Sequence, residues 1–141
     1  MDCPLGHGAL QQDSHAGIEV AVCDICGGEW LQRDQLTALE RATVNDPVVL
    51  AGTLEYDANP SARACPVCAK KMYEFDYRAN PLEIDACPDG HGYWLDGGEE
   101  SRVREAIRQR ARDLNRAASA EATFGGFMSK IRGQLGGKGR H

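Results

Sequence analysis

Six cysteines and two of the four histidines of this 141-residue chain lie in short clusters with the spacing of metal ligands. Two clusters have the pattern Cys-x-x-Cys, and two have the pattern Cys-x-x-x-His. Thiolate and imidazole are donors that zinc prefers, and pairs at this spacing are typical of the corners of small zinc-binding modules. The candidate metal ligands are Cys3, His7, Cys23, Cys26, Cys65, Cys68, Cys87 and His91.

The clusters belong to an internal repeat. The stretch 23–31, CDICGGEWL, has the same length as 87–95, CPDGHGYWL, and the Cys-Pro at position 3 recurs at position 65. Fifteen residues separate the two corners of the first copy and eighteen those of the second, whereas thirty-eight residues separate the copies. Each copy therefore supplies three cysteines and one histidine of its own, and we expect two independent tetrahedral sites with two Zn²⁺ per chain.

The two histidines sit one position later than the cysteines that they replace. In an alignment of the copies, Gly6 and Gly90 occupy the columns in which the other copy has Cys68 and Cys26, and the histidine follows each glycine. Imidazole reaches further than a thiol, and glycine relaxes the corner. A nitrogen can therefore return to the same vertex of the metal site.

The same residues also fit two other kinds of chemistry. The Cys65–Cys68 pair also has the spacing of a redox-active dithiol, and three cysteines with one histidine can hold iron or an iron–sulfur cluster. Four protein ligands on one ion leave no position for a substrate, which indicates structural zinc. We find no catalytic motif, and we expect the chain not to be an enzyme.

The residues between the corners predict small β-structures. Alternation over 18–22, 72–77 and 82–84 indicates β-hairpins, and a Trp-Leu pair after the second corner of each copy indicates a short strand whose indole covers a small core. Helical spacing follows each copy, over 35–42 and from about 98 to 118. We expect a small metal-stabilised α+β fold with two tandem zinc ribbons and a C-terminal amphipathic helix, packed into one compact body. The expected segments are 1–42 (ribbon 1 with its short helix), 43–62 (connecting segment), 63–97 (ribbon 2), 98–120 (basic amphipathic helix) and 121–141 (Gly-rich basic tail).

Charge is distributed unevenly along the chain, whose formal net charge is −5. Ten Lys and Arg stand against three Asp and Glu in residues 102–141, whereas residues 1–101 are strongly acidic. The start of the chain has no basic leader or long apolar run, and no apolar run approaches the ~18 residues of a membrane span. We therefore expect a reducing, cytoplasmic compartment and a partner at the basic C-terminal region. The candidate contact residues are Arg104, Arg108, Arg112, Arg116, Phe124, Phe127, Met128, Lys130, Ile131 and Arg132.

The cysteine motifs resemble those of the bacterial transcription-factor-IIB-type zinc-ribbon family. The resemblance rests on CPVC at 65–68, CDICGGEWL at 23–31 and WLDGGE at 94–99, and two such units cover about 1–40 and 63–101. The chain departs from the family in the shifted His7 and His91, and in Gln32-Arg33-Asp34 where Asp-x-Gly is expected. The resemblance implies a zinc ribbon, a fold that serves nucleic-acid-binding, polymerase-associated and adaptor proteins alike.

Two functions fit these features. The first is a non-enzymatic module that contacts nucleic acid or the transcription machinery through its basic C-terminal region. The second is a protein-interaction adaptor that docks through the apolar C-terminal residues, for which an anionic membrane surface or a second copy of the chain are further candidate partners. A thiol redox protein is a third alternative.

Overall fold

The computed structural model describes residues 1–136 of the chain, with the side chains of 1–122 and of residue 125. The chain divides into two compact units, Met1–Arg108 and Gln109–His141. The strands and both cysteine-rich copies belong to the first unit. The described part of the second unit, residues 109–136, is helical.

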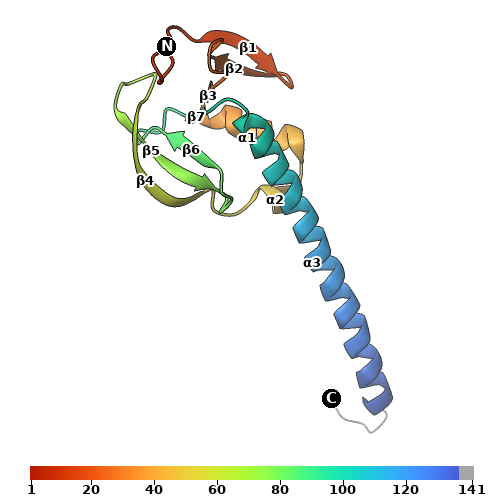
Figure 1. Ribbon diagram of the computed structural model, residues 1–141. Helices are drawn as coiled ribbons and strands as arrows, with labels where there is room; N and C mark the ends of the chain where they lie inside the picture. Colours follow the sequence, from red (N-terminus) through yellow and green to blue (C-terminus); the bar gives the residue numbers. More distant parts are fainter. Residues whose placement is uncertain (137–141) are drawn as a thin grey trace. The chain divides into compact units, whose positions relative to one another are not determined.

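One antiparallel sheet of seven strands forms the framework of the first unit (Figure 1). Each copy contributes a hairpin and a three-residue strand, and the connecting segment adds an edge strand. The spatial order is β1 (Gln11–His15), β2 (Ile18–Val22), β3 (Glu29–Leu31), β7 (Tyr93–Leu95), β6 (Glu83–Ala86), β5 (Lys71–Tyr77) and β4 (Glu55–Ala64).

The two copies join through their shortest strands. β3 of the first copy pairs with β7 of the second, and all six residues of these strands are buried. The expected single body is therefore a continuous sheet rather than two ribbons in surface contact. Three-residue strands bury too little surface to be stable alone, so each copy depends on this pairing as well as on its own corners.

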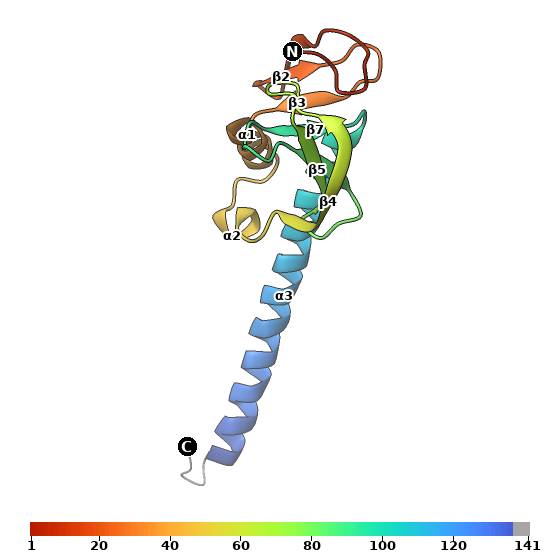
Figure 2. The same ribbon diagram turned by 90° about the vertical axis from the view of Figure 1, so that its left-hand side faces the viewer.

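Each copy ends in a helix that starts in the same way. α1 (Arg33–Thr43) follows β3 and contacts β2 and β3, and α3 (Glu99–Gly136) follows β7 (Figure 2). The Gln35 side chain accepts a hydrogen bond of 2.8 Å from the Gln32 backbone N–H, and Glu99 accepts one of 2.6 Å from that of Asp96. These bonds satisfy an N–H group at the start of each helix, so α1 begins at Arg33, ahead of the expected start.

One core cluster lies around the buried cysteines and also contains Trp30, Trp94, Ala21 and Met72. Trp30 and Trp94 are almost fully buried, which confirms the expected packing role of both indoles. Leu36 and Leu39 of α1 are buried on one side, and α3 buries Val103 and Ile107. The largest buried side chains are Trp30, Trp94, Tyr77, Phe75, Leu31, Leu36, Leu39, Ile84, Leu95, Ile107, Val20 and Val103.

The segment 43–62 is more structured than a connection. It contains α2 (Pro47–Leu50), whose first turn is capped by Asp46, and most of β4, which pairs with β5 of the second copy. Of the apolar residues in α2, Val49 is buried and Val48 is exposed. α3 likewise continues past the position at which we expected the helix to give way to a tail, and ends at Gly136. Among the described residues, no helix combines the length and apolarity needed to span a membrane.

Candidate metal centres

The eight predicted ligands meet in two separate clusters. In each, the four candidate ligand atoms all lie within 4.8 Å of one another. Each cluster has two buried cysteines, one half-buried cysteine and one exposed histidine, so both clusters lie at the surface of the first unit with their sulfur atoms turned inward. The first cluster is Cys3, His7, Cys23 and Cys26, and the second is Cys65, Cys68, Cys87 and His91.

All four corners are closed by the same backbone hydrogen bond. The N–H of the first cysteine donates to the carbonyl oxygen five residues later, at 2.8 Å in three corners and 3.1 Å in the fourth. Loop length is therefore constant, whether the second ligand is a cysteine or a histidine. The four bonds run from Cys3 to Gly8, from Cys23 to Gly28, from Cys65 to Lys70 and from Cys87 to Gly92.

The histidine corners differ from the cysteine corners in the position of one left-handed residue. In the Cys-x-x-Cys corners the fourth residue after the first cysteine has positive φ, namely Gly27 at 74° and Ala69 at 65°. In the histidine corners the third residue has it, at Gly6 (83°) and Gly90 (80°), and the ligand comes fourth. Ligand and left-handed residue have exchanged places. The predicted one-position shift of His7 and His91 thus has a backbone cause, because glycine adopts positive φ without steric cost.

Sulfur and nitrogen atoms in the clusters lie at non-bonded but close distances. The Sγ atoms of Cys3 and Cys26 are 3.8 Å apart, and those of Cys68 and Cys87 are 3.6 Å apart. The histidine Nδ1 atoms lie 3.3–3.7 Å from neighbouring sulfur atoms. A disulfide bond is about 2.05 Å long, and all six cysteines are free. The clusters therefore have the size of a site for a single metal ion.

The local backbone prepares one thiol in each cluster for ionisation. Backbone N–H groups of its own corner lower the pKa of Cys23 to about 6. At the equivalent Cys87, burial opposes ionisation, but the N–H groups of that corner outweigh it and lower the pKa to about 7. Burial raises the pKa of Cys26 and Cys65 to about 11. A bound cation is thus needed to keep all the thiols of a cluster ionised at neutral pH.

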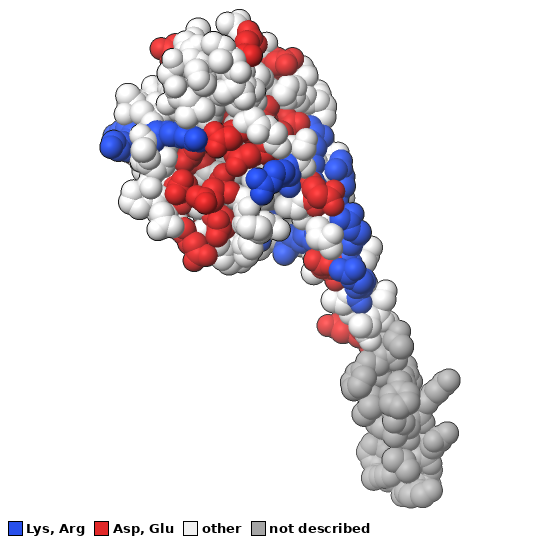
Figure 3. Space-filling model, in the orientation of Figure 1, with Lys and Arg blue, Asp and Glu red and all other residues white. Residues whose placement is uncertain are grey.

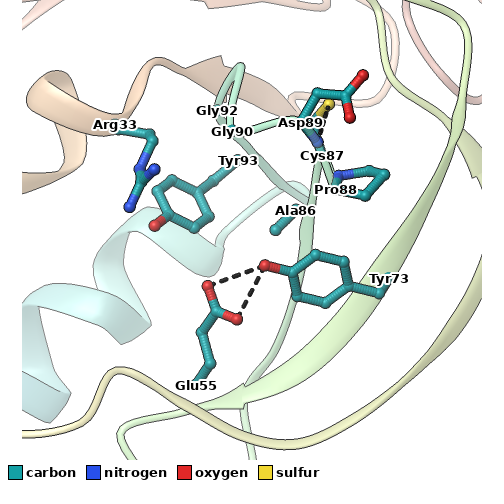
Figure 4. A pocket seen from close by; sticks show the side chains of 10 residues that line it. All are labelled: Arg33, Glu55, Tyr73, Ala86, Cys87, Pro88, Asp89, Gly90, Gly92 and Tyr93. Carbon is teal, nitrogen blue, oxygen red and sulfur yellow. Dashed lines mark hydrogen bonds between the residues drawn. The ribbon is translucent and has the colours of Figure 1, made fainter.

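A pocket of about 230 Å³ lies beside the second cluster (Figure 4). On its floor the Tyr73 hydroxyl donates to the Glu55 carboxylate, at 2.8 and 3.0 Å to the two oxygens. Arg33 from α1 and the Tyr93 ring form the opposite wall. Tyr73 is held protonated, since burial and the Glu55 carboxylate raise its pKa well above its usual range.

The predicted contact arginines lie on α3, and three of them form ion pairs along it. Arg104 is 2.9 Å from Glu100, Arg108 is 3.9 Å from Glu105, and Arg116 pairs with Asp113. Arg112, the fourth of these arginines, donates a hydrogen bond of 2.7 Å to the Gln109 side-chain oxygen, also on α3. The other candidates lie outside the residues whose side chains the structure describes, namely Phe124, Phe127, Met128, Lys130, Ile131 and Arg132.

Two features of the site were not predicted from the sequence. One is a group formed by His15, Glu29 and Glu100, whose candidate ligand atoms also lie within 4.8 Å of one another. The other is an acidic hollow of about 350 Å³ between β4, β6 and the start of α3, and Figure 3 shows acidic side chains gathered on this face. No local sequence pattern brings His15, Glu29 and Glu100 together, because they lie in three separate elements. The acidic side chains that line the hollow are Glu74, Glu83, Asp85, Asp96 and Glu99.

Comparison of the chain with models of protein families, with curated proteins and with solved structures finds no match.

Proposed function

We propose that each cluster binds one structural Zn²⁺ and that the chain is a non-catalytic zinc-ribbon protein that acts as a protein-interaction module. The observation that carries the zinc assignment is the spacing of the ligand atoms. Tetrahedral zinc with Zn–S of about 2.3 Å and Zn–N of about 2.1 Å separates two sulfur atoms by about 3.8 Å, and sulfur from nitrogen by about 3.6 Å. The separations of 3.6–3.8 Å and 3.3–3.7 Å agree with these values.

A structural role follows from the number of ligands. Four protein donors fill a tetrahedral coordination shell, so no position is open to water or substrate. Three thiolates with one Zn²⁺ give each centre a charge of −1, which makes the first unit more acidic still. We also propose that each copy is a zinc ribbon and that the chain carries two of them in tandem, as the resemblance of its cysteine motifs to transcription-factor-IIB-type zinc ribbons implies.

The partner surface that we propose is the apolar side of α3 beyond the first unit. Val103 and Ile107 are buried, and the same spacing continues at Ala111 and Leu114, which are half-buried, and at Ala118, which is exposed. A helix with an uncovered apolar stripe is only marginally stable in water. A partner protein that packs along this stripe would stabilise it, as in other helix-in-groove complexes.

Binding to nucleic acid is the second candidate, and the basic composition of residues 102–141 favours it. Two observations count against it. The ion pairs of Arg104, Arg108 and Arg116 partly neutralise these guanidinium groups, and the acidic side chains of the hollow repel phosphates. Phosphate contacts would therefore fall to the basic residues nearer the C-terminus.

A matched pair of variants distinguishes the two candidates. Leu114→Glu places a charge in the apolar stripe, and Arg116→Glu reverses a charge outside it. With a photo-crosslinker at Ala118, we expect capture of a protein partner to be lost in Leu114→Glu and retained in Arg116→Glu, with two zinc ions per chain in both. The contrary result is binding to a generic DNA duplex that weakens at least tenfold between roughly 50 and 200 mM salt and is reduced by Arg116→Glu. In that case the nucleic-acid function replaces the proposed one.

A further inference from the structure

Three side chains from separate elements converge beside the first copy. His15 ends β1, Glu29 begins β3 and Glu100 lies in the first turn of α3. The His15 Nδ1 atom is 2.5 Å from Glu100 Oε1 and 3.1 Å from Glu29 Oε2. The Glu29 side chain is 5% exposed, whereas His15 and Glu100 remain in contact with solvent. One imidazole and two carboxylates thus share a small site that opens to the surface.

We propose that His15, Glu29 and Glu100 form a third metal site, which binds a divalent first-row metal ion through nitrogen and oxygen. Donors of this kind bind such ions at about 2.0–2.2 Å, and at right angles around an ion they lie about 3 Å apart. The observed separations of 2.5 and 3.1 Å from the imidazole nitrogen bracket this value. Three protein ligands leave the remaining coordination positions to water, unlike the four-ligand cysteine clusters.

A buried oxygen in the site has no partner without an ion. Glu29 Oε1 is shielded from solvent and accepts no hydrogen bond, while Oε2 of the same carboxylate faces His15. Leaving a buried carboxylate oxygen unsatisfied is costly, and a metal ion bound by this carboxylate would compensate for it.

The groups around the site also orient and balance it. Asp13 Oδ2 lies 3.1 Å from His15 Nε2, so that carboxylate can hold the imidazole with Nδ1 turned toward the two glutamates. Arg104 pairs with Glu100 Oε2 and leaves Oε1 for the site. Three carboxylates, one guanidinium and a neutral imidazole carry a net charge of −2, which a divalent cation neutralises.

In the absence of a metal ion, protons must take its place. Burial and the neighbouring Glu100 carboxylate raise the pKa of Glu29 to about 8. Hydrogen bonding to Glu100 raises the pKa of His15.

This site would connect the two copies. His15 and Glu29 belong to the first copy and Glu100 to the helix that follows the second, so a bound ion would join the β1–β2 hairpin to α3. The second copy has no equivalent, because Tyr93 occupies the column of Glu29. Any additional ion should therefore bind once per chain.

Equilibrium dialysis against Zn²⁺ at pH 8 tests the proposal on the full-length chain already holding two zinc ions. We expect a third zinc ion per chain in the wild type, and only two in Glu29→Gln and in His15→Ala. Glu19→Gln removes an exposed carboxylate from the same hairpin and should keep three. His15 is partly exposed, so His15→Ala should fold even if Glu29→Gln does not, and retention of the two cluster ions checks folding. A wild type that binds only two ions, or a third ion retained in His15→Ala, would overturn the third site and leave the cysteine clusters unaffected.

Discussion

Trp30 and Trp94 lie directly opposite one another on β3 and β7, where the two copies of the repeat join. They occupy the same column of the repeat, and the residues on either side of them pair symmetrically, so an approximate twofold axis passes between the two tryptophans. Each indole packs on a glycine of the other copy. A Cβ atom on Gly28 would lie 2.3 Å from Trp94 Cζ2, and one on Gly92 would lie 2.9 Å from Trp30 Cζ2. Trp94 therefore requires a glycine at position 28, and at position 92 the Leu31 carbonyl oxygen, 2.4 Å from an added Cβ, requires one together with Trp30.

This packing predicts that Gly28→Ala destabilises the first unit without changing its metal ligands. The added methyl group overlaps the Trp94 ring, and we expect a loss of about 1–3 kcal/mol in the free energy of unfolding. Urea denaturation followed by tryptophan fluorescence measures it. Gly125→Ala is the control, because a Cβ at that helical position meets nothing within 4 Å, and it should leave the unfolding of the first unit unchanged. Equal stability of Gly28→Ala and wild type would show that the two copies do not pack in this way.

Loss of one ligand should affect both copies. Cys26→Ala and Cys68→Ala each remove the half-buried cysteine of one cluster. We expect the zinc content to fall from two ions to one, and the protein to lose several kcal/mol of stability, because metal binding is coupled to folding in modules this small. The copy that loses its ion should unfold first. Because β3 pairs with β7, this unfolding removes a strand partner from the other copy and should lower its melting temperature too. Two zinc ions per chain and unchanged melting in either variant would contradict the assignment.

The ion pair of Arg78 with Glu40 should be important for stability. The Arg78 Nε lies 3.1 Å from Glu40 Oε2, their side chains are 6% and 7% exposed, and Arg78 also donates to the carbonyl of Leu50. We expect Arg78→Ala to cost about 3–5 kcal/mol, since it leaves the buried Glu40 carboxylate without a positive charge and with the Tyr77 hydroxyl as its remaining hydrogen-bond donor. Lys70→Ala breaks the exposed pair with Asp89 and should cost less than about 1 kcal/mol. Similar losses in the two variants, measured by urea denaturation, would disprove this difference.

Glu99 should make stability depend on pH. Burial raises its pKa to about 7, from about 4.5 in an exposed chain. The folded state then holds a proton that the unfolded state releases, so this contribution to stability decreases as pH rises from about 4.5 through 7. Glu99→Gln removes the effect but keeps the hydrogen-bond acceptor for Asp96. The free energy of unfolding of the variant minus that of the wild type should be about 1 kcal/mol higher at pH 8.5 than at pH 6. Thermal unfolding at both pH values measures this difference. A difference between variant and wild type that does not change with pH would contradict the raised pKa.

The cysteine corners could be predicted from sequence because their chemistry is local. Ligand type, spacing and repetition assign the residues of each cluster, and the exchange of Gly6 and His7 is visible in the alignment of the copies. The short strands and the burial of Trp30 could be predicted for the same reason, since a few neighbouring residues determine them.

The features that join the two copies could not be predicted in this way. The pairing of β3 with β7 depends on two three-residue segments separated by more than sixty positions, and no local pattern identifies them as partners. β4 has Asn59-Pro60 in its middle, which indicates a turn, yet the strand forms because it is an edge strand with irregular pairing to β5. The His15–Glu29–Glu100 group depends on both of the joined copies, and so it becomes visible only once the sheet is known.

X-ray absorption at the zinc edge, on the full-length chain loaded with two equivalents of zinc, is the most direct measurement of the two-centre assignment. We predict an average shell of three sulfur atoms at about 2.3 Å and one nitrogen at about 2.0–2.1 Å, with loss of cooperative melting after chelation. A shell dominated by oxygen, or a chelated chain that melts as before, would contradict it.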